Sequence, residues 1–412
     1  MPVASGRQNY AKQPISIMQK IKTTAIYRTV PLLFAAACLI MQSCRHDVMV
    51  DFPGGQKPGG AEPDPSVPDA PIGFYLLNQG NMGMNKASID YYDYTTGEYT
   101  RNIYTQANPD AVMALGDVGN QIVIHSDRLW AIINCSNKVE VMQASDCRRI
   151  GQTDIPNCRY MAFDGDYAYI SSYAGPVIID DDYDQLGYVD KINTTTLREE
   201  ARCIVRFQPD GIAVSGGRLY VANSGGYRPN NYEKTLSVID ISTFTVEKEV
   251  ELGINLNQVV ADADGKIWVS SRGDYYDVEP HLYCYDPASD RIAASFDIDA
   301  SSMWLSGGTL YTVGNSFSYD TMTSTPMFSR IDTSAMTVEQ SHWEGAEEFG
   351  QIKAPYCIAV DPVRGDIYIT DAGNYVNPGY LYAFAADGSY KWRQRTGDVP
   401  ASIAFLYPED AD

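Results

Sequence analysis

Short runs of alternating apolar and polar residues, separated by tight turns of Gly, Asp or Ser, recur along most of this chain. In residues 121–135 and 211–226, for example, two such runs flank a short turn, which is the pattern of a β-hairpin. A second, weaker hairpin follows, as in residues 237–251. The pattern therefore predicts repeating units of four strands. An aromatic residue marks the second strand of each of seven copies: Tyr75, Trp130, Tyr169, Tyr220, Trp268, Tyr311 and Tyr368.

The spacing between these aromatic residues, roughly 40 to 57 positions, is typical of an all-β propeller, in which four-stranded blades surround a central axis. The N-terminal unit lacks a first strand, because residues 74–80 resemble a second strand and residues 88–100 an outer hairpin. Residues 400–408 match the first-strand pattern of the other units. We therefore predict a seven-bladed β-propeller with four strands per blade, closed by the C-terminal strand joining the N-terminal blade.

The first 43 residues have the composition of a lipoprotein signal peptide. Five basic residues and no acidic ones precede an apolar run over about 30–41, which ends before Ser43 and Cys44. A transmembrane helix is a weaker interpretation, because the run is too short to span a bilayer comfortably. We expect Cys44 to be lipidated, residues 44–71 to form a flexible tether rich in Pro, Gly and Asp, and residues 72–412 to form the propeller.

The formal net charge of the chain is −21, and removal of five basic leader residues makes it −26 (−21 − 5). Such an acidic protein is not expected to bind nucleic acid, because phosphates require a basic surface. The cysteines of the predicted propeller permit disulfides or buried thiols, and no C-x-x-C motif supports a metal or redox site. They are Cys135, Cys147, Cys158, Cys203, Cys284 and Cys357.

The connections within the predicted blades differ between the two faces of the ring. Those that join first to second strands, or third to fourth, are minimal turns. Those that join second to third strands, called the middle loops below, are long and rich in Tyr, Asn, Gly, Arg and Asp. We expect them at residues 79–86, 134–138, 173–186, 223–235, 271–281, 315–326 and 371–379. Varied loops on a rigid scaffold predict that the middle-loop face binds the ligand.

Aromatic rings, amides and guanidiniums in the middle loops are candidates for ligand contacts, since they can stack and form hydrogen bonds. Arg228 and Arg272 are favoured among them because each lies in an aromatic, Gly-rich loop. The predicted ligand-binding residues are Gln79, Asn81, Asn134, Tyr173, Tyr227, Arg228, Asn231, Tyr232, Arg272, Asp274, Tyr275, Tyr276, Tyr319, Asn374 and Tyr375.

Neither a metal site nor a catalytic site is predicted. The acidic run at residues 180–184 offers oxygen ligands for calcium, but it lacks the spacing of a known calcium loop and is interpreted as a solvated loop. The motifs G-x-S-x-G and H-E-x-x-H and a phosphate-binding loop are not found. We therefore expect a protein that is not an enzyme. A metal-assisted hydrolase of the propeller lactonase type, with Asn223 and Asp371 lining its pore, is the less favoured alternative.

The opening segment Phe74–Met84 and blades such as residues 211–226 resemble those of the BtuG-like cobalamin-binding lipoproteins, within the YncE-like seven-bladed propellers. The resemblance covers essentially the whole mature chain. It implies an outer-membrane lipoprotein at the cell surface that captures cobalamin or a related corrinoid and passes it to a TonB-dependent transporter. No cofactor is required, and the membrane is contacted only through the lipid. Residues 45–47 lack the acidic cluster often linked to surface export, which leaves the orientation open.

The middle loops have a composition compatible with such a ligand. A corrinoid presents a broad macrocycle edged by amide arms, which can pack on tyrosine rings and bond to asparagine side chains. A second hypothesis is an adhesive or scaffolding surface lipoprotein that binds a protein or a glycan with the same face.

Overall fold

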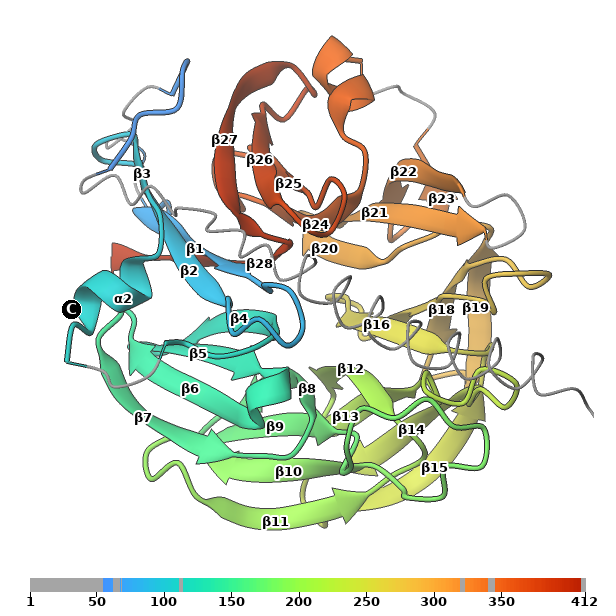
Figure 1. Cartoon of the computed structure of the whole chain (residues 1–412). Helices are drawn as coiled ribbons and strands as arrows, with labels where there is room; N and C mark the ends of the chain where they lie inside the picture. Colours follow the sequence, from blue (N-terminus) through green and yellow to red (C-terminus); the bar gives the residue numbers. More distant parts are fainter. Residues whose placement is uncertain are drawn as a thin grey trace, which may run out of the picture. The chain divides into compact units, whose positions relative to one another are not determined.

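A computed structural model describes residues 55–61, 67, 69–110, 114–318, 323–339 and 345–408. All of them belong to one compact unit, residues 53–412. The described residues form seven sheets of four antiparallel strands each. Figure 1 shows these sheets arranged around a common centre. The structure thus confirms the seven-bladed, four-stranded propeller that the repeat predicts.

The blades are numbered here in chain order, with the strands of each given from the centre outward. Blade 1 consists of β28 (Pro400–Leu406), β1 (Gly73–Asn78), β2 (Ser88–Asp93) and β3 (Glu98–Thr100), and blade 2 of β4 (Gly119–His125), β5 (Arg128–Ile133), β6 (Lys138–Gln143) and β7 (Arg149–Asp154). Blade 3 consists of β8 (Cys158–Asp164), β9 (Tyr167–Ser172), β10 (Tyr188–Asn193) and β11 (Glu199–Ile204), and blade 4 of β12 (Pro209–Ser215), β13 (Arg218–Asn223), β14 (Thr235–Asp240) and β15 (Thr245–Glu251).

The remaining three blades follow the same order. Blade 5 consists of β16 (Leu256–Ala261), β17 (Ile267–Ser271), β18 (His281–Asp286) and β19 (Arg291–Phe296), and blade 6 of β20 (Ser302–Ser306), β21 (Thr309–Ser318), β22 (Thr323–Asp332) and β23 (Thr337–Val338). Blade 7 consists of β24 (Pro355–Val360), β25 (Ile367–Asp371), β26 (Pro378–Phe384) and β27 (Tyr390–Asp398).

Helical segments are short. Within the described residues they are α2 (Ile103–Ala107), η1 (Asn134–Ser136) and η2 (Glu347–Gln351). In the part of the chain that the structure describes, no helix has the length and apolarity needed to cross a membrane.

The C-terminal strand closes the ring. Strand β28 pairs antiparallel with β1, so that Tyr75 lies opposite Ala404 and Gly73 opposite Leu406. It supplies the innermost strand of blade 1, which the N-terminal unit lacks. The closure predicted from residues 400–408 is therefore confirmed, and the ring has no unpaired inner edge at this seam.

The seven aromatic residues that mark the repeat all lie on second strands and are all buried. They fill the spaces between neighbouring blades. Trp130 of blade 2 shares a core cluster with Met161 of blade 3, and Trp268 of blade 5 shares one with Leu310 of blade 6. Since large aromatic rings bury the most apolar surface, these contacts supply much of the free energy that holds one blade against the next.

Part of the segment expected to be a tether lies on the propeller. Gln56 exchanges two backbone hydrogen bonds with Tyr99 of β3, of 2.9 and 2.8 Å. Ala61 is buried in a cluster with Tyr92 of blade 1 and Trp392 of blade 7. Residues 55–61 therefore cover the outer strands on both sides of the seam at which the ring closes. The predicted signal peptide and Cys44 lie outside the described residues.

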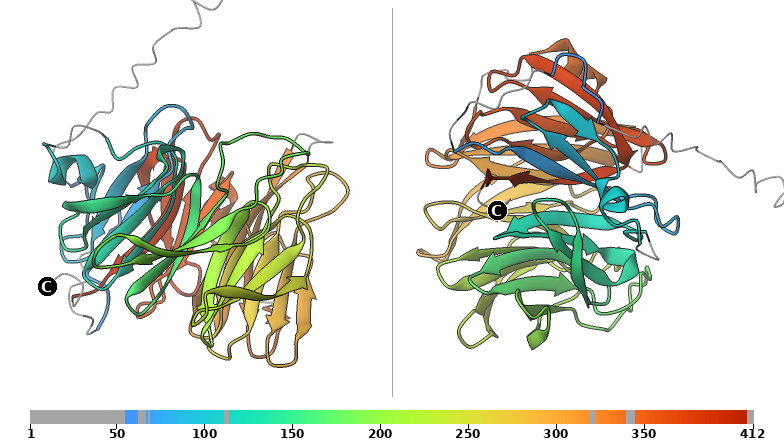
Figure 2. Two further views of the ribbon diagram at one scale, coloured as in Figure 1. Left: turned by 90° about the horizontal axis from the view of Figure 1, so that it is seen from below. Right: turned by 90° about the vertical axis from the view of Figure 1, so that its left-hand side faces the viewer.

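The middle loops and the short turns emerge at opposite ends of the strands (Figure 2). Blade 3 has a middle loop of 15 residues (173–187) and blade 4 one of 11 residues (224–234), whereas the first turn of each is two residues long. The loop expected at residues 315–326 in blade 6 is mostly strand, because β21 and β22 extend to leave only residues 319–322 between them. Ser, Thr and Phe alternate there, and such residues favour extended backbone.

The six cysteines of the propeller form no disulfide, and all but Cys135 are buried. Burial raises the pKa of the Cys158 thiol, which lies at the start of β8, to about 12. It also raises the pKa of Cys357, at the start of β24, to about 12. These thiols therefore stay protonated at neutral pH and act as small apolar side chains.

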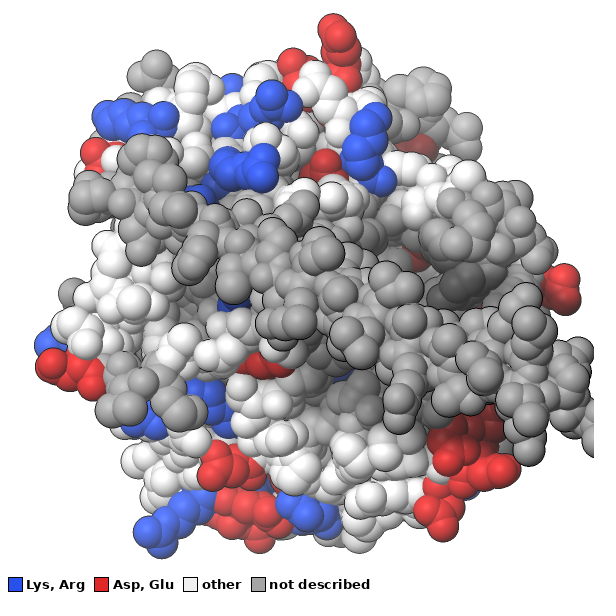
Figure 3. Space-filling model, viewed as in Figure 1, with Lys and Arg blue, Asp and Glu red and all other residues white. Residues whose placement is uncertain are grey.

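Charge on the outer surface is unevenly distributed. On the face drawn in Figure 3, Lys and Arg side chains gather over blade 7. The outer strand β27 contributes three exposed basic residues at alternate positions, Lys391, Arg393 and Arg395. Charged side chains on an edge strand hinder pairing with another chain, which explains a basic stripe on an otherwise acidic protein.

Candidate functional site

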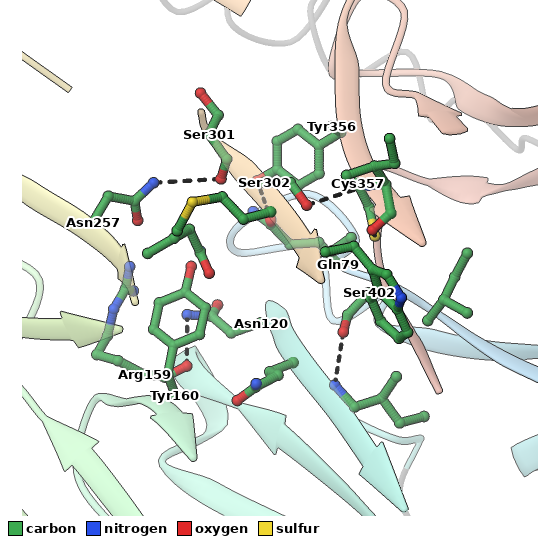
Figure 4. Close-up of a pocket in the computed structure, with 18 of the residues that line it drawn as sticks. Gln79, Asn120, Arg159, Tyr160, Asn257, Ser301, Ser302, Tyr356, Cys357 and Ser402 are labelled. Carbon is green, nitrogen blue, oxygen red and sulfur yellow. Dashed lines mark hydrogen bonds between the residues drawn. The ribbon is translucent and has the colours of Figure 1, made fainter. Parts of the chain in front are cut away.

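The seven innermost strands surround a central channel of about 830 Å³. This volume lies within the range of pockets that bind small molecules. Side chains from six blades point toward this space in Figure 4, among them Asn120, Arg159, Asn257, Tyr356 and Ser402. The middle loops contribute further residues to its lining at one end, so the channel opens on the middle-loop face.

A β-bulge at the start of six of the seven innermost strands shapes the lining. The register with the second strand shifts there, for example between Cys158 and Met161 in β8 and between Leu256 and Val259 in β16. A bulge turns side chains away from strict alternation. Two consecutive residues can therefore line the channel, as Arg159 and Tyr160 do.

Polar side chains near the start of the innermost strands also join neighbouring blades. The Ser402 hydroxyl of blade 1 accepts a hydrogen bond of 3.2 Å from the backbone N–H of Ile122 in blade 2. The side chain of Gln121 in blade 2 accepts one of 2.7 Å from Met161 in blade 3, and Ser302 in blade 6 accepts one of 3.2 Å from Ile358 in blade 7. These bonds satisfy N–H groups that the bulges leave unpaired in the sheets.

The strongest charge cluster at the channel centres on Asp210 of β12, whose side chain is fully buried. Its carboxylate accepts hydrogen bonds from Arg159 Nε at 2.9 Å, from Arg272 Nη1 at 2.8 Å and from the Tyr173 hydroxyl at 2.8 Å. Burial alone would raise the pKa of Asp210, but the two guanidiniums outweigh it and lower the pKa. Asp210 is therefore a carboxylate at neutral pH.

Gly211 explains why this carboxylate is covered rather than exposed in the channel. A Cβ atom at Gly211 would lie 2.4 Å from the backbone oxygen of Asn257 in the next blade. The absence of a side chain lets blade 5 approach blade 4 closely beside Asp210.

The two arginines are held in place by further contacts. Arg272 Nη2 donates to Asn257 Oδ1 at 2.7 Å. The Arg159 guanidinium lies 4.5 Å from the centre of the Tyr173 ring, and Tyr173 meets Tyr227 edge-on at 5.0 Å. Guanidiniums and aromatic rings from blades 3, 4 and 5 thus form one wall of the channel mouth.

The opposite wall is neutral and polar. The Tyr356 hydroxyl donates to Gln79 Oε1 at 2.6 Å, which joins blade 7 to the middle loop of blade 1. Nearby, Asn315 Nδ2 donates to the Tyr375 hydroxyl at 3.0 Å, and Asn81 Nδ2 donates to the Tyr375 carbonyl at 2.6 Å. The middle loops of blades 1 and 7 are tied together in this way.

The other end of the channel is more apolar. Trp304 and Phe405 line it and meet edge-on with ring centres 5.6 Å apart. Ile124 and Ile403 add aliphatic surface. The channel therefore changes from charged and polar near the middle loops to apolar near the short turns.

Six of the predicted ligand-binding residues line the channel: Gln79, Asn134, Tyr227, Arg272, Tyr275 and Tyr276. The structure places eight others outside the lining: Asn81, Tyr173, Arg228, Asn231, Tyr232, Asp274, Asn374 and Tyr375. Tyr319 lies outside the described residues.

Several of those eight residues have contacts that hold the loops in shape. The Arg228 guanidinium stacks on Phe207 at 4.0 Å. Asp274 accepts backbone N–H bonds from Tyr276 and Val278, and Asn374 accepts two such bonds within its own loop. These side chains position the loops that carry the lining residues.

The acidic run of blade 3 bonds to the neighbouring loop. The Asp181 carboxylate accepts hydrogen bonds from the backbone and side-chain nitrogens of Asn230. Among the residues that the structure describes, no group of three or more His, Cys, Asp or Glu side chains is placed to hold a metal ion.

The polar residues of the innermost strands were not predicted from the sequence, because ligand contacts were expected only in the loops. Arg159, Tyr160, Asp210, Asn257 and Tyr356 all lie at the bulges. A signal was present in the repeat, because each first strand opens with a pair that is often polar before its apolar run.

Exposed apolar side chains concentrate on the middle-loop face. Among the described residues, 14 large apolar side chains are exposed, and ten of them lie in middle loops. They are Met82, Met84, Val177, Ile178, Ile179, Leu186, Tyr276, Val278, Tyr375 and Val376. Clustered exposed apolar surface is typical of a binding face.

These features define a propeller with a channel that opens among the middle loops, and comparison with known proteins places the chain in a family. The chain belongs to the family described as "Domain of unknown function (DUF5074)", whose model matches residues 72–390. No curated protein matches the chain.

Solved structures share the fold at low sequence identity. A functionally unknown protein from Desulfotomaculum acetoxidans DSM 771 has a TM-score of 0.57 at 11% identity, over 82% of this chain and 99% of that one. A quinonprotein alcohol dehydrogenase-like protein from Bacteroides thetaiotaomicron VPI-5482 has a TM-score of 0.55 at 12% identity, over 81% and 78%. Hydrazine synthase from Kuenenia stuttgartiensis has a TM-score of 0.54 at 16% identity, over 69% and 89%. At such identities the likeness extends to the fold alone.

Proposed function

We propose that this protein is a lipid-anchored receptor of the outer membrane that captures cobalamin or a related corrinoid at the channel mouth. The observation that carries the proposal is the mouth itself. Tyr227, Tyr275 and Tyr276 and the amides of Gln79 and Asn134 gather around one opening on one face. Binding without chemical conversion is the proposed activity, so the protein is not an enzyme.

The chemistry of the rim suits a corrinoid. Tyrosine rings offer flat surfaces for the macrocycle, and the side-chain nitrogen of Gln79 can donate to its amide arms. The Asn134 amide is buried and bonds to Asn157 and Cys158, so it holds the lining in shape. The loops that carry these groups are fastened to one another, as Asn81 and Asn315 are to Tyr375. Loops that are ordered before binding lose little conformational entropy when the ligand arrives, which favours high affinity.

The exposed apolar side chains of the same face support a protein partner. In the proposed function this partner is a TonB-dependent transporter, which meets Met82, Ile179 and Val376 around the loaded mouth and receives the ligand. Anchoring through Cys44 keeps the receptor beside the transporter in the membrane, with no other membrane contact.

The same apolar surface favours a second candidate, an adhesive or scaffolding surface lipoprotein. In that case the middle-loop face binds a protein or glycan partner and the channel carries no corrinoid. A partner recovered with equal efficiency in the presence and absence of corrinoid would favour this alternative.

Titration of the purified full-length protein in detergent with cyanocobalamin tests the proposal. We expect saturable heat release in calorimetry together with a shift of the corrinoid absorbance bands. A flat calorimetric trace and an unchanged spectrum at micromolar protein would rule out the corrinoid receptor.

A further inference from the structure

We infer that Arg159 and Arg272 form an oxyanion-binding subsite in the channel wall, which takes the phosphodiester of the corrinoid's nucleotide tail. The inference rests on the proposed receptor function for the identity of the ligand. The subsite itself rests only on the geometry of the cluster around Asp210.

The cluster contains more positive than negative charge. Two guanidiniums share the single carboxylate of Asp210, with N–O distances of 2.9 Å to Arg159 and 2.8 Å to Arg272. Arginine remains protonated in proteins, and Asp210 is ionised because its pKa is lowered. One positive charge is therefore left over at this point of the wall.

The guanidiniums also have hydrogen-bonding capacity to spare. Arg159 uses Nε to bond Asp210, while its Nη1 and Nη2 groups donate to none of the residues that the structure describes. The side chains of Arg159 and Arg272 are 15% and 25% exposed, and both line the channel. A guanidinium edge with free N–H groups matches the paired oxygens of a phosphate or carboxylate.

Neutral donors surround the same point. Burial raises the pKa of Tyr356, Tyr160 and Tyr227, and the charges of Arg159 and Arg272 act in the opposite direction on all three. The three phenols, which line the channel together with the two arginines, therefore stay protonated at neutral pH. The Tyr356 hydroxyl already donates to Gln79 Oε1, whereas the protonated hydroxyl groups of Tyr160 and Tyr227 can donate to an oxyanion that the guanidiniums hold.

The other carboxyl groups of the described lining are Asp299 and Glu279, and neither is in ion-pair contact with the two arginines. Asp299 accepts a hydrogen bond of 2.7 Å from the Ser301 hydroxyl, and burial raises its pKa while the charge of Arg272 acts in the opposite direction. Glu279 is exposed on the middle loop of blade 5.

The periphery of a corrinoid consists of neutral amides and methyl groups, and the phosphodiester of its nucleotide tail is the single anionic group there. Cobinamide, which has the same macrocycle without this tail, lacks that anion. A receptor with an oxyanion subsite must therefore bind the two compounds with different affinities. A receptor that contacts only the macrocycle binds both with the same affinity.

The test compares cyanocobalamin and dicyanocobinamide on four full-length proteins: wild type, Arg159→Gln, Arg159→Lys and Arg202→Gln. The last variant is a matched control, since Arg202 pairs with the buried Asp190 on the outer strands of blade 3. We expect wild type and the control to bind cobalamin about 10- to 100-fold more tightly than cobinamide, the range of a charge-assisted hydrogen bond. Arg159→Gln loses most of this preference, and Arg159→Lys, which keeps the charge, retains part of it.

A second measurement uses inorganic phosphate alone and does not depend on the corrinoid. Phosphate is expected to raise the melting temperature of wild type, to raise that of Asp210→Asn further, and to leave Arg159→Gln unchanged. If no corrinoid binds but phosphate changes the melting temperatures in this way, the oxyanion subsite is supported and the receptor function is ruled out. Equal affinity of wild type for cobalamin and cobinamide, or equal phosphate effects on wild type and Arg159→Gln, would overturn the subsite.

Discussion

Arg272 Nη1 of blade 5 donates a hydrogen bond of 2.8 Å to Asp210 Oδ2 of blade 4, across 62 positions of sequence. The same carboxylate binds Arg159 of blade 3. One buried side chain therefore fixes the relative positions of three blades at the end of the channel where the ligand is proposed to enter. Loss of Asp210 should affect stability and binding together.

Replacement of Asp210 by Ala is expected to lower the free energy of unfolding by about 3–5 kcal/mol, because it leaves two partly buried guanidiniums without their counter-charge. Urea denaturation followed by tryptophan fluorescence measures the loss. Glu247→Ala, which removes the exposed partner of Arg218, is the matched control and should leave the midpoint unchanged. Equal midpoints for Asp210→Ala and wild type would show that the cluster contributes nothing to stability.

Asp190 of β10 predicts a specific dependence of stability on pH. Burial raises its pKa from 3.8 to about 6, although Arg202 bonds both of its oxygens, at 2.7 and 3.0 Å. Between pH 4 and 6 the folded protein thus binds more protons at this site than the unfolded chain does. The contribution of Asp190 to stability is fully present below about pH 4 and is lost as the pH rises through 6.

The variant Asp190→Asn, whose side chain cannot ionise, lacks this dependence. The free energy of unfolding of wild type should fall relative to that of the variant by about 2–3 kcal/mol from pH 4 to pH 7. Urea unfolding curves of both proteins at four pH values give the difference. A difference that stays constant across this range would contradict the assigned direction.

Variants of Tyr276 and Arg228 distinguish a residue that lines the channel mouth from one that only supports a loop. Tyr276 lines the mouth and is 57% exposed, so Tyr276→Ala should weaken cobalamin binding by about 1–2 kcal/mol. Arg228 packs on Phe207 away from the lining, and Arg228→Ala should leave the affinity within about twofold of wild type. Calorimetry measures the cobalamin affinity of both variants. A larger loss of affinity for Arg228→Ala than for Tyr276→Ala would place the ligand beyond the channel mouth.

Cys44 predicts membrane attachment. Cys44→Ser should abolish incorporation of labelled palmitate and move the protein from the membrane fraction to the soluble fraction, since the diacylglycerol thioether requires this thiol. Cys38→Ala, which changes the other cysteine of the leader, is the control and should remain lipidated. Labelling that persists in Cys44→Ser would assign the anchor elsewhere.

The sequence predicted the architecture well, because the features that define it are local. Alternating runs, two-residue turns and one aromatic residue per blade are each visible within a few tens of positions. Even the closure between β28 and β1 could be predicted, since residues 400–408 repeat a pattern that the first blade lacks. The core of a propeller repeats the same short motif in every blade. The copies within a single chain can therefore be compared with one another.

The channel lining could not be predicted to the same extent. Asp210 contacts Arg159 and Arg272 only because three blades pack side by side. The partners are 51 and 62 positions away in the sequence, so no local sequence pattern indicates these contacts. The bulges that turn these side chains toward the channel depend on packing between innermost strands. Residue types typical of ligand contacts, such as Arg228 and Asp274, proved to be used for shaping the loops.

The pairing of β28 with β1 also determines when the molecule can become complete. The innermost strand of the first blade is synthesised more than 300 residues after its neighbour in the sheet. A chain that lacks residues 400–406 therefore cannot assemble a closed propeller. A premature stop codon before residue 400 would leave blade 1 without its innermost strand and the ring unclosed.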